Sequence, residues 1–383
     1  MYVERLAAKL LKKFLARMRN IGLRVFIYNL NLPTKTKRRV SNLLFNVISD
    51  LFLIDWLTDQ MDLPEGLDRN LIRVLTYRIG IEKNFEVLNR IEEVNGLSLR
   101  DFQRAINEKM RLLHREPPIK RIALKYSYPE FFVRRLLKLL GREKTERLLA
   151  SMNSRLPYTW LCVDTVKYDR DYVISLLEDE GFEVYPDEDF YDVVRIVRMP
   201  KRIEKSRAYR AGMFIIAEKA SIAATHALNP DDGDVILDMC AAPGIKLICT
   251  AFKMNSGRII AVDISKNRME RLKRLVKRYN IASRIHIETR ILDSRKLRAE
   301  DIGAVDKIIV DAECSSSGII PKSPDVKLRI SKARVLELSR LQRELLRRAL
   351  ELCQELHGEF VVYSVCSLLP EEGEYVVLNA IRD

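Results

Sequence analysis

Two cysteines stand where a chemically active thiol would be expected. Cys314 comes soon after the apolar run 307–310, and Cys366 comes soon after the apolar run 359–363. Both runs have the length and composition of buried strands, so both thiols are expected just beyond strand ends. A thiolate in such a place can add to an electron-poor ring, and the ring can then accept a methyl group.

A turn of small residues lies further upstream, between the apolar run 235–237 and a helical pattern over 245–254. Small side chains let backbone amides approach a ligand, and the first N–H groups of the helix are free to bind it. The turn has neither the two-glycine dinucleotide spacing nor a phosphate-binding loop, which favours a nucleoside such as an adenosyl group. The predicted cofactor contacts are Asp238, Cys240, Ala241, Ala242, Pro243 and Gly244.

Two more carboxylates follow the next predicted strands. Asp263 ends the run 258–263 and is placed to accept both hydroxyls of a ribose. The alternative for Asp263 is an N-cap of the next helix, a position for which Ser265 competes. Asp293 follows the run 285–287 and is expected on the adenine side of the cofactor, with an ordinary turn aspartate as the alternative.

The elements that must position these residues alternate from about residue 212 onward. Alternation of buried strands with helices predicts a doubly wound α/β domain, in which a parallel sheet is covered on both faces. Ligands bind at the carboxyl ends of such strands, where the candidate residues lie. The predicted strands are 235–237, 258–263, 285–287, 307–310 and 359–363, and the main helices are 245–254, 266–280 and 332–354.

The first half of the chain predicts two further regions. Residues 1–115 show only helical spacing of apolar residues, and Pro117-Pro118 interrupts that pattern. Residues 120–210 predict two short helices, a small α+β unit with strands near 160–163, 182–185 and 193–197, and a basic linker over 199–210. The predicted domains are therefore 1–115, 120–210 and 211–383.

Charge and cysteine content restrict the function. The 383 residues carry a net charge of +14 and a pI near 9.4, which predicts a polyanionic partner, with a generally basic solvated surface as the alternative. Six cysteines without paired spacings and four histidines predict neither a disulfide framework nor a metal site. No apolar run reaches the length of a membrane span. A cytoplasmic protein, favoured as a monomer, is expected.

Several motifs in one order resemble a known family. The chain is similar to the Sun-type (Nol/Nop/Sun, Fmu-like) RNA cytosine-5 methyltransferases with a NusB-like helical domain in front. The stretches that carry the resemblance are 237–244 with Lys246, 311–315, 324–327, 341–346 and 363–371, with weaker matches at 128–130 and 161–165.

This resemblance implies S-adenosyl-L-methionine as cofactor and a cytosine in RNA as substrate, ribosomal RNA before transfer RNA. By the same resemblance Cys366 is the nucleophile and Cys314 assists product release. Asp311 faces the cytosine and is also expected to line the cofactor pocket, while Lys246 matches the motif lysine. The other cysteines, Cys162, Cys249 and Cys353, are expected to be small buried hydrophobes.

RNA contacts are expected from the basic linker. The candidates for binding the RNA backbone are Lys201, Arg202, Lys205, Arg207 and Arg210, for which a solvated run of charge is the alternative. An enzyme that modifies a base must take it out of its stack, so the linker and the small α+β unit are expected to hold an unpaired region.

The chain departs from the family pattern at four places. Glu313 replaces a proline before Cys314, Ile245 and Leu247 replace a glycine and a threonine, and Ser316-Ser317 stands where Gly-Thr is common. The chain also stops one helix after Cys366, where relatives have two more strands. These departures leave two alternatives open: a catalytically degenerate RNA-binding or ribosome-assembly protein, and a methyltransferase that acts on another atom.

Overall fold

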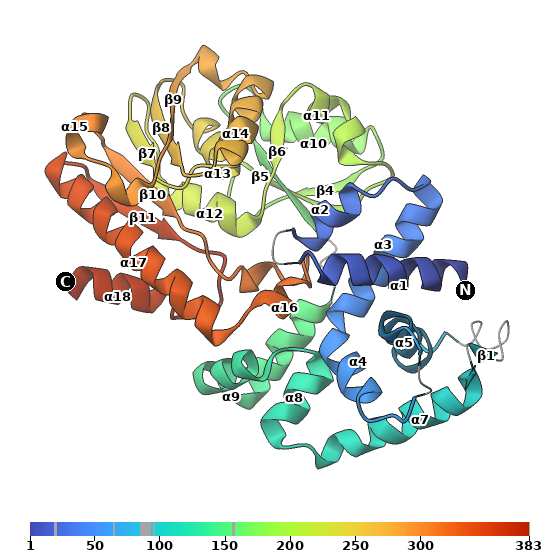
Figure 1. Ribbon diagram of the computed structural model, residues 1–383. Helices are drawn as coiled ribbons and strands as arrows, with labels where there is room; N and C mark the ends of the chain where they lie inside the picture. Colours follow the sequence, from blue (N-terminus) through green and yellow to red (C-terminus); the bar gives the residue numbers. More distant parts are fainter. Residues whose placement is uncertain (19–20, 64–65, 85–92, 95, 155–157, 383) are drawn as a thin grey trace. The chain divides into compact units, whose positions relative to one another are not determined.

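The computed structural model describes residues 1–18, 21–63, 66–84, 93–94, 96–154 and 158–382 (Figure 1). They belong to two compact units. The first, the helical unit, comprises Met1–Arg155 and the separate segment Ser315–Val335. The second, the catalytic unit, comprises Leu156–Cys314 and Leu336–Asp383. The predicted domain boundaries at 115, 120 and 210 stay predictions, since the compact units divide the chain at other positions.

The helical unit is built from amphipathic helices whose apolar faces form one core. Leu11, Phe14, Leu44 and Ile48 are fully buried within it. Helices with one apolar stripe must pack on one another, because none can bury that stripe alone. The helices are α1 (Tyr2–Leu15), α2 (Leu23–Tyr28), α3 (Thr34–Ser49), α4 (Leu51–Thr58), α5 (Arg69–Thr76), α7 (Leu99–Leu112), α8 (Pro118–Tyr126) and α9 (Glu130–Asn153, kinked at Gly141).

The expectation of helices alone over 1–115 is wrong at one place. Strands β1 (Glu93–Val94) and β2 (Leu97–Ser98) pair in antiparallel fashion. Gly96 lies between them with φ +81°, a backbone conformation that favours glycine. Within the described ranges no single helix is long and apolar enough to cross a bilayer, although the bent pair α3 and α4 together meets the same criterion.

The segment Ser315–Val335 belongs to the helical unit although the chain on both sides of it belongs to the catalytic unit. It contains the short helix α16 (Val326–Arg329) and the fully buried Lys327. The Lys327 ammonium donates to the carbonyl of Ser49 at 2.9 Å and to Asn153 Oδ1 at 2.7 Å, and it lies 4.0 Å from the centre of the Tyr128 ring. Burial lowers the pKa of Lys327 to about 7.

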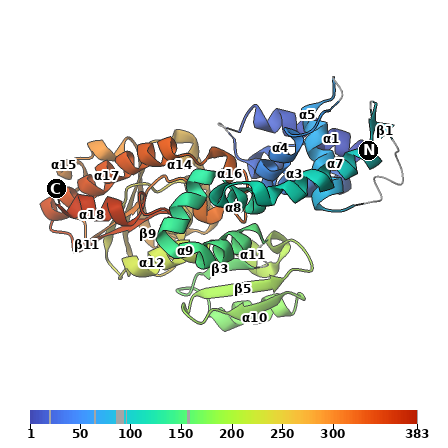
Figure 2. The ribbon, with the colours of Figure 1, turned by 90° about the horizontal axis from the view of Figure 1, so that it is seen from below.

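The catalytic unit begins with a four-stranded antiparallel sheet in the order β4-β5-β3-β6. Figure 2 labels its two central strands, β3 and β5. Its elements are β3 (Thr159–Val163), α10 (Arg170–Glu178), β4 (Glu183–Pro186), β5 (Val193–Arg198), α11 (Arg207–Arg210) and β6 (Phe214–Ile216). Side chains of α10 and α11 pack on one face of this sheet. Strand β6 was not predicted, so the basic linker lies inside this small unit instead of following it.

A five-stranded parallel sheet follows, in the order β11-β10-β7-β8-β9. The order reverses after β7, which confirms the predicted doubly wound α/β fold. Its elements are α12 (Lys219–Leu228), β7 (Val235–Asp238), α13 (Ile245–Ala251), β8 (Gly257–Asp263), α14 (Lys266–Arg278), β9 (Ile285–Ile291), α15 (Ala299–Ile302), β10 (Lys307–Asp311), α17 (Lys332–Glu355), β11 (Phe360–Ser364) and α18 (Glu374–Arg382).

Helices cover both faces of the parallel sheet, as the sequence pattern predicts. Alternate strand residues such as Ile236 and Ile259 pack with α12, α13 and α14 on one face. Their neighbours, such as Leu237 and Ile260, pack with α15 and α17 on the other face. This two-sided burial explains why the strands read as continuous apolar runs and not as an alternating pattern.

Candidate active site

The two candidate cysteines lie together at the carboxyl ends of neighbouring strands. Strands β10 and β11 are parallel, and their register pairs the last residues, Asp311 and Ser364. Cys314 lies three residues after Asp311, and Cys366 lies two residues after Ser364. Their sulfurs are 3.2 Å apart. Cys366 is exposed and Cys314 is partly exposed. The expectation that both thiols lie just beyond strand ends is confirmed, while their individual roles remain predictions.

A charged pair lies at the same strand ends. Asp311 ends β10, and its Oδ2 lies 2.6 Å from the ammonium of Lys246, near the start of α13. The hydroxyl of Ser364 donates to Asp311 Oδ1 at 2.9 Å, which connects this carboxylate to the end of β11. The same ammonium is 3.3 Å from the Ser221 hydroxyl. The structure thus brings together Cys314, Cys366, Asp311 and Lys246 at one edge of the sheet.

Two buried polar side chains that the sequence reasoning did not single out support the cysteine loops. Gln342 on α17 donates to the carbonyl of Glu313, the residue before Cys314, at 2.8 Å. Glu372 accepts from the Ser367 hydroxyl at 2.6 Å, directly after Cys366. The amide of Gln342 and the carboxylate of Glu372 are 3.4 Å apart, and both side chains are fully buried. One hydrogen-bonded network therefore positions both loops.

The turn after β7 is pinned to the neighbouring strands through its backbone. The N–H of Met239 donates to the carbonyl of Ile309, and the N–H of Ala241 donates to the carbonyl of Val262, at 3.0 and 2.9 Å. Gly244 ends the turn with φ +104°, and a Cβ there would lie only 3.0 Å from Leu272 Cγ. Any larger residue would push α14 away, so glycine is required by both conformation and space.

Asp263 is a buried acceptor at the end of β8. Its Oδ2 accepts from the N–H of Ala242 at 3.2 Å, and its Oδ1 accepts from the N–H of Ser265 at 2.8 Å. The side chain of Ser265, not that of Asp263, caps α14 by accepting from the N–H of Arg268. The alternative that Asp263 serves as the helix cap is therefore excluded, and its carboxylate instead joins β8 to the cofactor turn.

Burial raises the pKa of two side chains in the turn, the carboxyl of Asp238 and the thiol of Cys240. Asp238 is buried, and desolvation together with the charge of Asp311 raises its pKa to about 7. Burial and the same carboxylates raise the pKa of the Cys240 thiol. A thiol held neutral in this way is a poor nucleophile, so Cys240 is suited to packing in the turn.

Asp293 holds a more exposed position after β9. Its carboxylate accepts from the N–H of Arg295 at 3.1 Å and forms an ion pair with the guanidinium of Arg295 at 2.7 Å. These hydrogen bonds lower the pKa of Asp293. Arg295 in turn contacts Glu344 on α17 at 2.5 Å. The predicted role of Asp293 on the adenine side stays a prediction.

Comparison with known proteins identifies a family whose members are similar to this chain. Residues 225–383 match the family described as 16S rRNA methyltransferase RsmB/F, and residues 128–201 match the RsmF/B-like ferredoxin-like domain. The chain carries an RsmB/F (Sun-type) methyltransferase domain. S-adenosyl-L-methionine is the cofactor of this methyltransferase family.

Individual relatives agree with the RsmB/F assignment. The chain is 29% identical to ribosomal RNA small subunit methyltransferase B of Yersinia enterocolitica. The match covers 76% of this chain and 64% of that relative. It is 26% identical to the protein of the same name from Pectobacterium carotovorum over 98% of its length and 88% of that relative. The crystal structure of PH0851 covers 94% of the chain with a TM-score of 0.72 and 27% identity, and 84% of that structure is matched.

The carboxylates of the RsmB/F domain fit its cofactor. Asp238, Asp263, Asp293 and Asp311 end or follow four of the five parallel strands, so acidic groups gather where the ligand binds in this fold. S-adenosyl-L-methionine carries a sulfonium and an ammonium, and such cations are favoured beside carboxylates. The backbone N–H groups near Gly244 are close to the same edge. These residues remain the candidate cofactor contacts.

The basic linker is partly neutralised by acidic side chains of the same chain. Lys201 and Arg207 both contact the carboxylate of Glu180, at 2.5 and 3.2 Å, and Arg202 pairs with Glu204 at 3.1 Å. Lys205 and Arg210 are exposed and have no ion pair among the described residues. The five predicted RNA contacts therefore differ in how much positive charge they offer, and their role stays a prediction.

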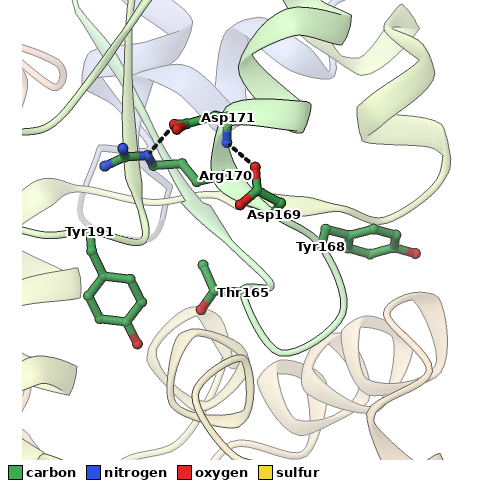
Figure 3. Close-up of a pocket in the computed structure, with 6 residues that line it drawn as sticks. All are labelled: Thr165, Tyr168, Asp169, Arg170, Asp171 and Tyr191. Atoms are coloured by element: carbon green, nitrogen blue, oxygen red, sulfur yellow. Dashed lines mark hydrogen bonds and ion pairs between the residues drawn. The ribbon is translucent and has the colours of Figure 1, made fainter.

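A polar pocket of about 320 Å³ lies in the small sheet unit, after the end of β3 (Figure 3). Asp169 caps α10 by accepting from the N–H groups of Asp171 and Tyr172, and Arg170 pairs with Asp171. None of the candidate cysteine or cofactor residues lines this pocket, so it is separate from the thiol pair. It is lined by Thr165, Tyr168, Asp169, Arg170, Asp171 and Tyr191.

The three remaining cysteines are placed as packing residues. Cys162 and Cys249 are fully buried, as expected, and burial raises the pKa of the Cys162 thiol. Cys353 on α17 is only partly buried, which differs from the expectation. Its thiol packs among apolar residues of the sheet face that α17 covers.

The raised pKa of Asp238 predicts a stability that falls with rising pH. The folded carboxyl holds its proton to about pH 7, whereas the unfolded one releases it near 3.8. The folded state is thus favoured at low pH. About 4 kcal/mol of this stabilisation is lost as the pH rises from about 4 to about 7. The D238N variant should lose this slope, measured as the denaturant midpoint of the ligand-free protein at pH 5 and pH 8.

The D293N variant is the matched control for this experiment. The pKa of Asp293 is lowered, so its contribution to stability is present at high pH and is lost as the pH falls. D293N should therefore keep the slope that D238N removes. An unchanged slope in D238N would show that Asp238 is ionised in the folded protein at neutral pH.

Proposed function

We propose that this protein methylates C5 of a cytosine in small-subunit ribosomal RNA, through a covalent bond between Cys366 and C6 of the ring. The observation that carries the proposal is the pair of thiols 3.2 Å apart beside the Asp311–Lys246 ion pair. The match of residues 225–383 to the RsmB/F family and the names of the relatives support RNA as the substrate. The choice of C5 rests on the chemistry of the two thiols, and the choice of cytosine rests on the resemblance to the RNA cytosine-5 methyltransferases.

The exposure of Cys366 suits the first step. Ionisation of this thiol carries little of the desolvation cost that keeps Cys240 neutral. A neighbouring thiol at 3.2 Å can donate a hydrogen bond to the Cys366 thiolate and stabilise it. The thiolate attacks C6 of the cytosine and forms the C6–S bond. The electron pair of the C5–C6 double bond shifts onto the ring, which makes C5 nucleophilic.

Asp311 and Lys246 present opposite charges to the ring. The carboxylate of Asp311 is a hydrogen-bond acceptor for the exocyclic amine of cytosine. The ammonium of Lys246 at 2.6 Å provides a positive charge against the negative charge that builds up on the ring during attack. When bound, S-adenosyl-L-methionine supplies the methyl group that C5 takes.

The last step returns both thiols to their starting state. C5 then carries a methyl group and a proton, and a base must remove that proton before the bond to Cys366 breaks. Cys314 first releases its own proton to solvent, and its thiolate is then the base within reach of this position, because its sulfur is next to that of Cys366. Loss of the C5 proton restores the C5–C6 double bond and expels the Cys366 thiolate.

This division of roles predicts opposite effects for the two cysteines. C366A should reduce methyl transfer to background, because no adduct forms. C314A should accumulate a covalent RNA–protein complex that survives denaturation, because the adduct forms but does not resolve. The assay mixes protein, labelled S-adenosyl-L-methionine and small-subunit ribosomal RNA, and then maps 5-methylcytosine and separates the products on a denaturing gel.

Cys353 gives a matched control for these variants, since it is a partly buried cysteine on α17. C353A should transfer methyl groups at the wild-type rate. Cofactor binding without transfer to any RNA by the wild-type protein would contradict the proposal and favour an RNA-binding or assembly role. Transfer to an atom other than cytosine C5 would indicate a different methyltransferase.

The departure at Glu313 predicts slow product release. A carboxylate adjacent to Cys314 disfavours the thiolate that must take the C5 proton. E313Q should therefore speed decay of the covalent complex, by up to about fivefold if the interaction is near the ~1 kcal/mol of two charges 4 Å apart in water. The measurement is a chase of preformed complex, with E300Q, an exposed change on α15, as the control.

An equal decay rate in E313Q and the wild type would contradict this role for Glu313. A slower decay would assign the opposite role, in which the Glu313 carboxylate itself helps to remove the proton. The chase separates these outcomes, because it starts from complex already formed through Cys366 and therefore measures decay alone.

A further inference from the structure

Helix α14 is the most basic element of the catalytic unit. Seven of its 13 residues are Lys or Arg, and Glu270 is its single acid. The helix begins three residues after Asp263, the buried carboxylate that accepts from the N–H of Ala242. A basic surface on this helix would therefore start at the edge of the sheet where the methyl-transfer residues lie.

The positive charge of α14 is concentrated on one face. Met269 and Leu272 are buried against the sheet and define the inner face. Four exposed cations lie on the opposite side, and none of them has an ion pair within the part of the chain that the structure describes. These cations are Lys266, Arg271, Arg274 and Lys277. They span about 16 Å along the helix axis at 1.5 Å per residue.

This surface differs from the basic linker because its four exposed cations have no acidic partner among the described residues. In the linker, hydrogen bonds from Lys201 and Arg207 lower the pKa of Glu180 to about 2, which shows how closely these charges are matched. On α14 only Lys273 has an acidic partner on the helix itself, Glu270 at 3.2 Å. Phosphates bind cations that have no competing carboxylate, since each contact releases counterions without first breaking an ion pair.

The two basic regions join at the end of α14. The guanidinium of Arg278 donates to the carbonyl of Tyr209 at 3.0 Å and lies 4.2 Å from the centre of the Tyr209 ring. This contact places α11, with the exposed Arg210, beside the last turn of α14 (Figure 1). The unpaired charge of the linker therefore continues the basic face of α14.

A groove runs along the side of the same helix. It has a volume of about 430 Å³, with Leu272, Val276 and Ile287 as its apolar part and Lys273 and Lys277 among its polar lining. An apolar floor beside ammonium groups suits a strand whose bases are uncovered and whose backbone is anionic.

We infer that the exposed face of α14, continued by Arg210, binds the sugar–phosphate backbone of the RNA substrate. The inference rests on the proposed RNA methyltransferase function and identifies the surface that holds that substrate. Backbone contacts of this kind position the RNA without reading its sequence. The base that enters the thiol pair is then selected at the sheet edge and not by α14.

The test is the double variant R271E/R274E, in which both changes lie on the outer face of α14. Binding of a fluorescein-labelled single-stranded RNA of random sequence is measured by anisotropy over a series of KCl concentrations. The variant should bind on the order of tenfold more weakly, and its salt slope should fall by about 2, one for each lost phosphate contact. The KM for small-subunit ribosomal RNA should rise while kcat is unchanged.

The matched control is R340E/R347E, which makes the same change in net charge at two exposed arginines of α17. It should bind RNA with an affinity close to that of the wild type. If R271E/R274E binds with wild-type affinity and slope, or if both variants weaken binding equally, the inference is wrong. A wild-type protein that binds RNA through α14 but transfers no methyl group would contradict the proposed function alone.

Discussion

The register between strands β10 and β11 is the constraint on which the site depends. It pairs Asp311 with Ser364, so the chain leaves both strands at the same level and the two thiols meet a few residues later. A slip by one residue would turn the strand side chains to the opposite face of the sheet. The Ser364–Asp311 hydrogen bond holds this register at the catalytic end. At the other end Lys307 is buried and pairs with Asp231 and Asp234 at 2.7 and 2.8 Å.

The loops beyond these strands need separate support, because no ladder continues there. Gln342 and Glu372 supply it from α17 and from the turn before α18, and both are buried where an unpaired polar group would be costly. After Cys314 the chain enters the helical unit, in which Lys327 is anchored by Ser49 and Asn153. A buried lysine donating to a carbonyl and an amide oxygen resists displacement, so the segment that follows Cys314 has a fixed anchor in that unit.

The sequence predicts the parts of this fold that are periodic and local. The alternation of apolar runs and helices predicted every strand of the parallel sheet, and the small residues before Gly244 predicted the turn between β7 and α13. Strand β6 was missed because it has only three residues and is defined by pairing with β3, far away in sequence. The pairing of Lys201 and Arg207 with Glu180 was also not predicted, because the partners are far apart in the sequence. Gln342 did leave a signal, since it interrupts the apolar stripe formed by Leu338, Leu345 and Ala349 on α17.

The charges of the catalytic unit are sorted by sign, and this sorting fits the chemistry of the two ligands proposed for it. Carboxylates gather at the strand ends, where Asp238 and Asp263 are buried beside Asp311. Ionised carboxylates at this edge repel phosphate and favour a cation, which fits the proposal that the cofactor binds there and the RNA backbone does not. Exposed arginines and lysines lie outside it on α14, where water screens their mutual repulsion. A neutral base is the part of the RNA that meets neither barrier. Under the proposed function, a chain of net charge +14 would thus admit a nucleobase to the acidic edge while holding the backbone elsewhere.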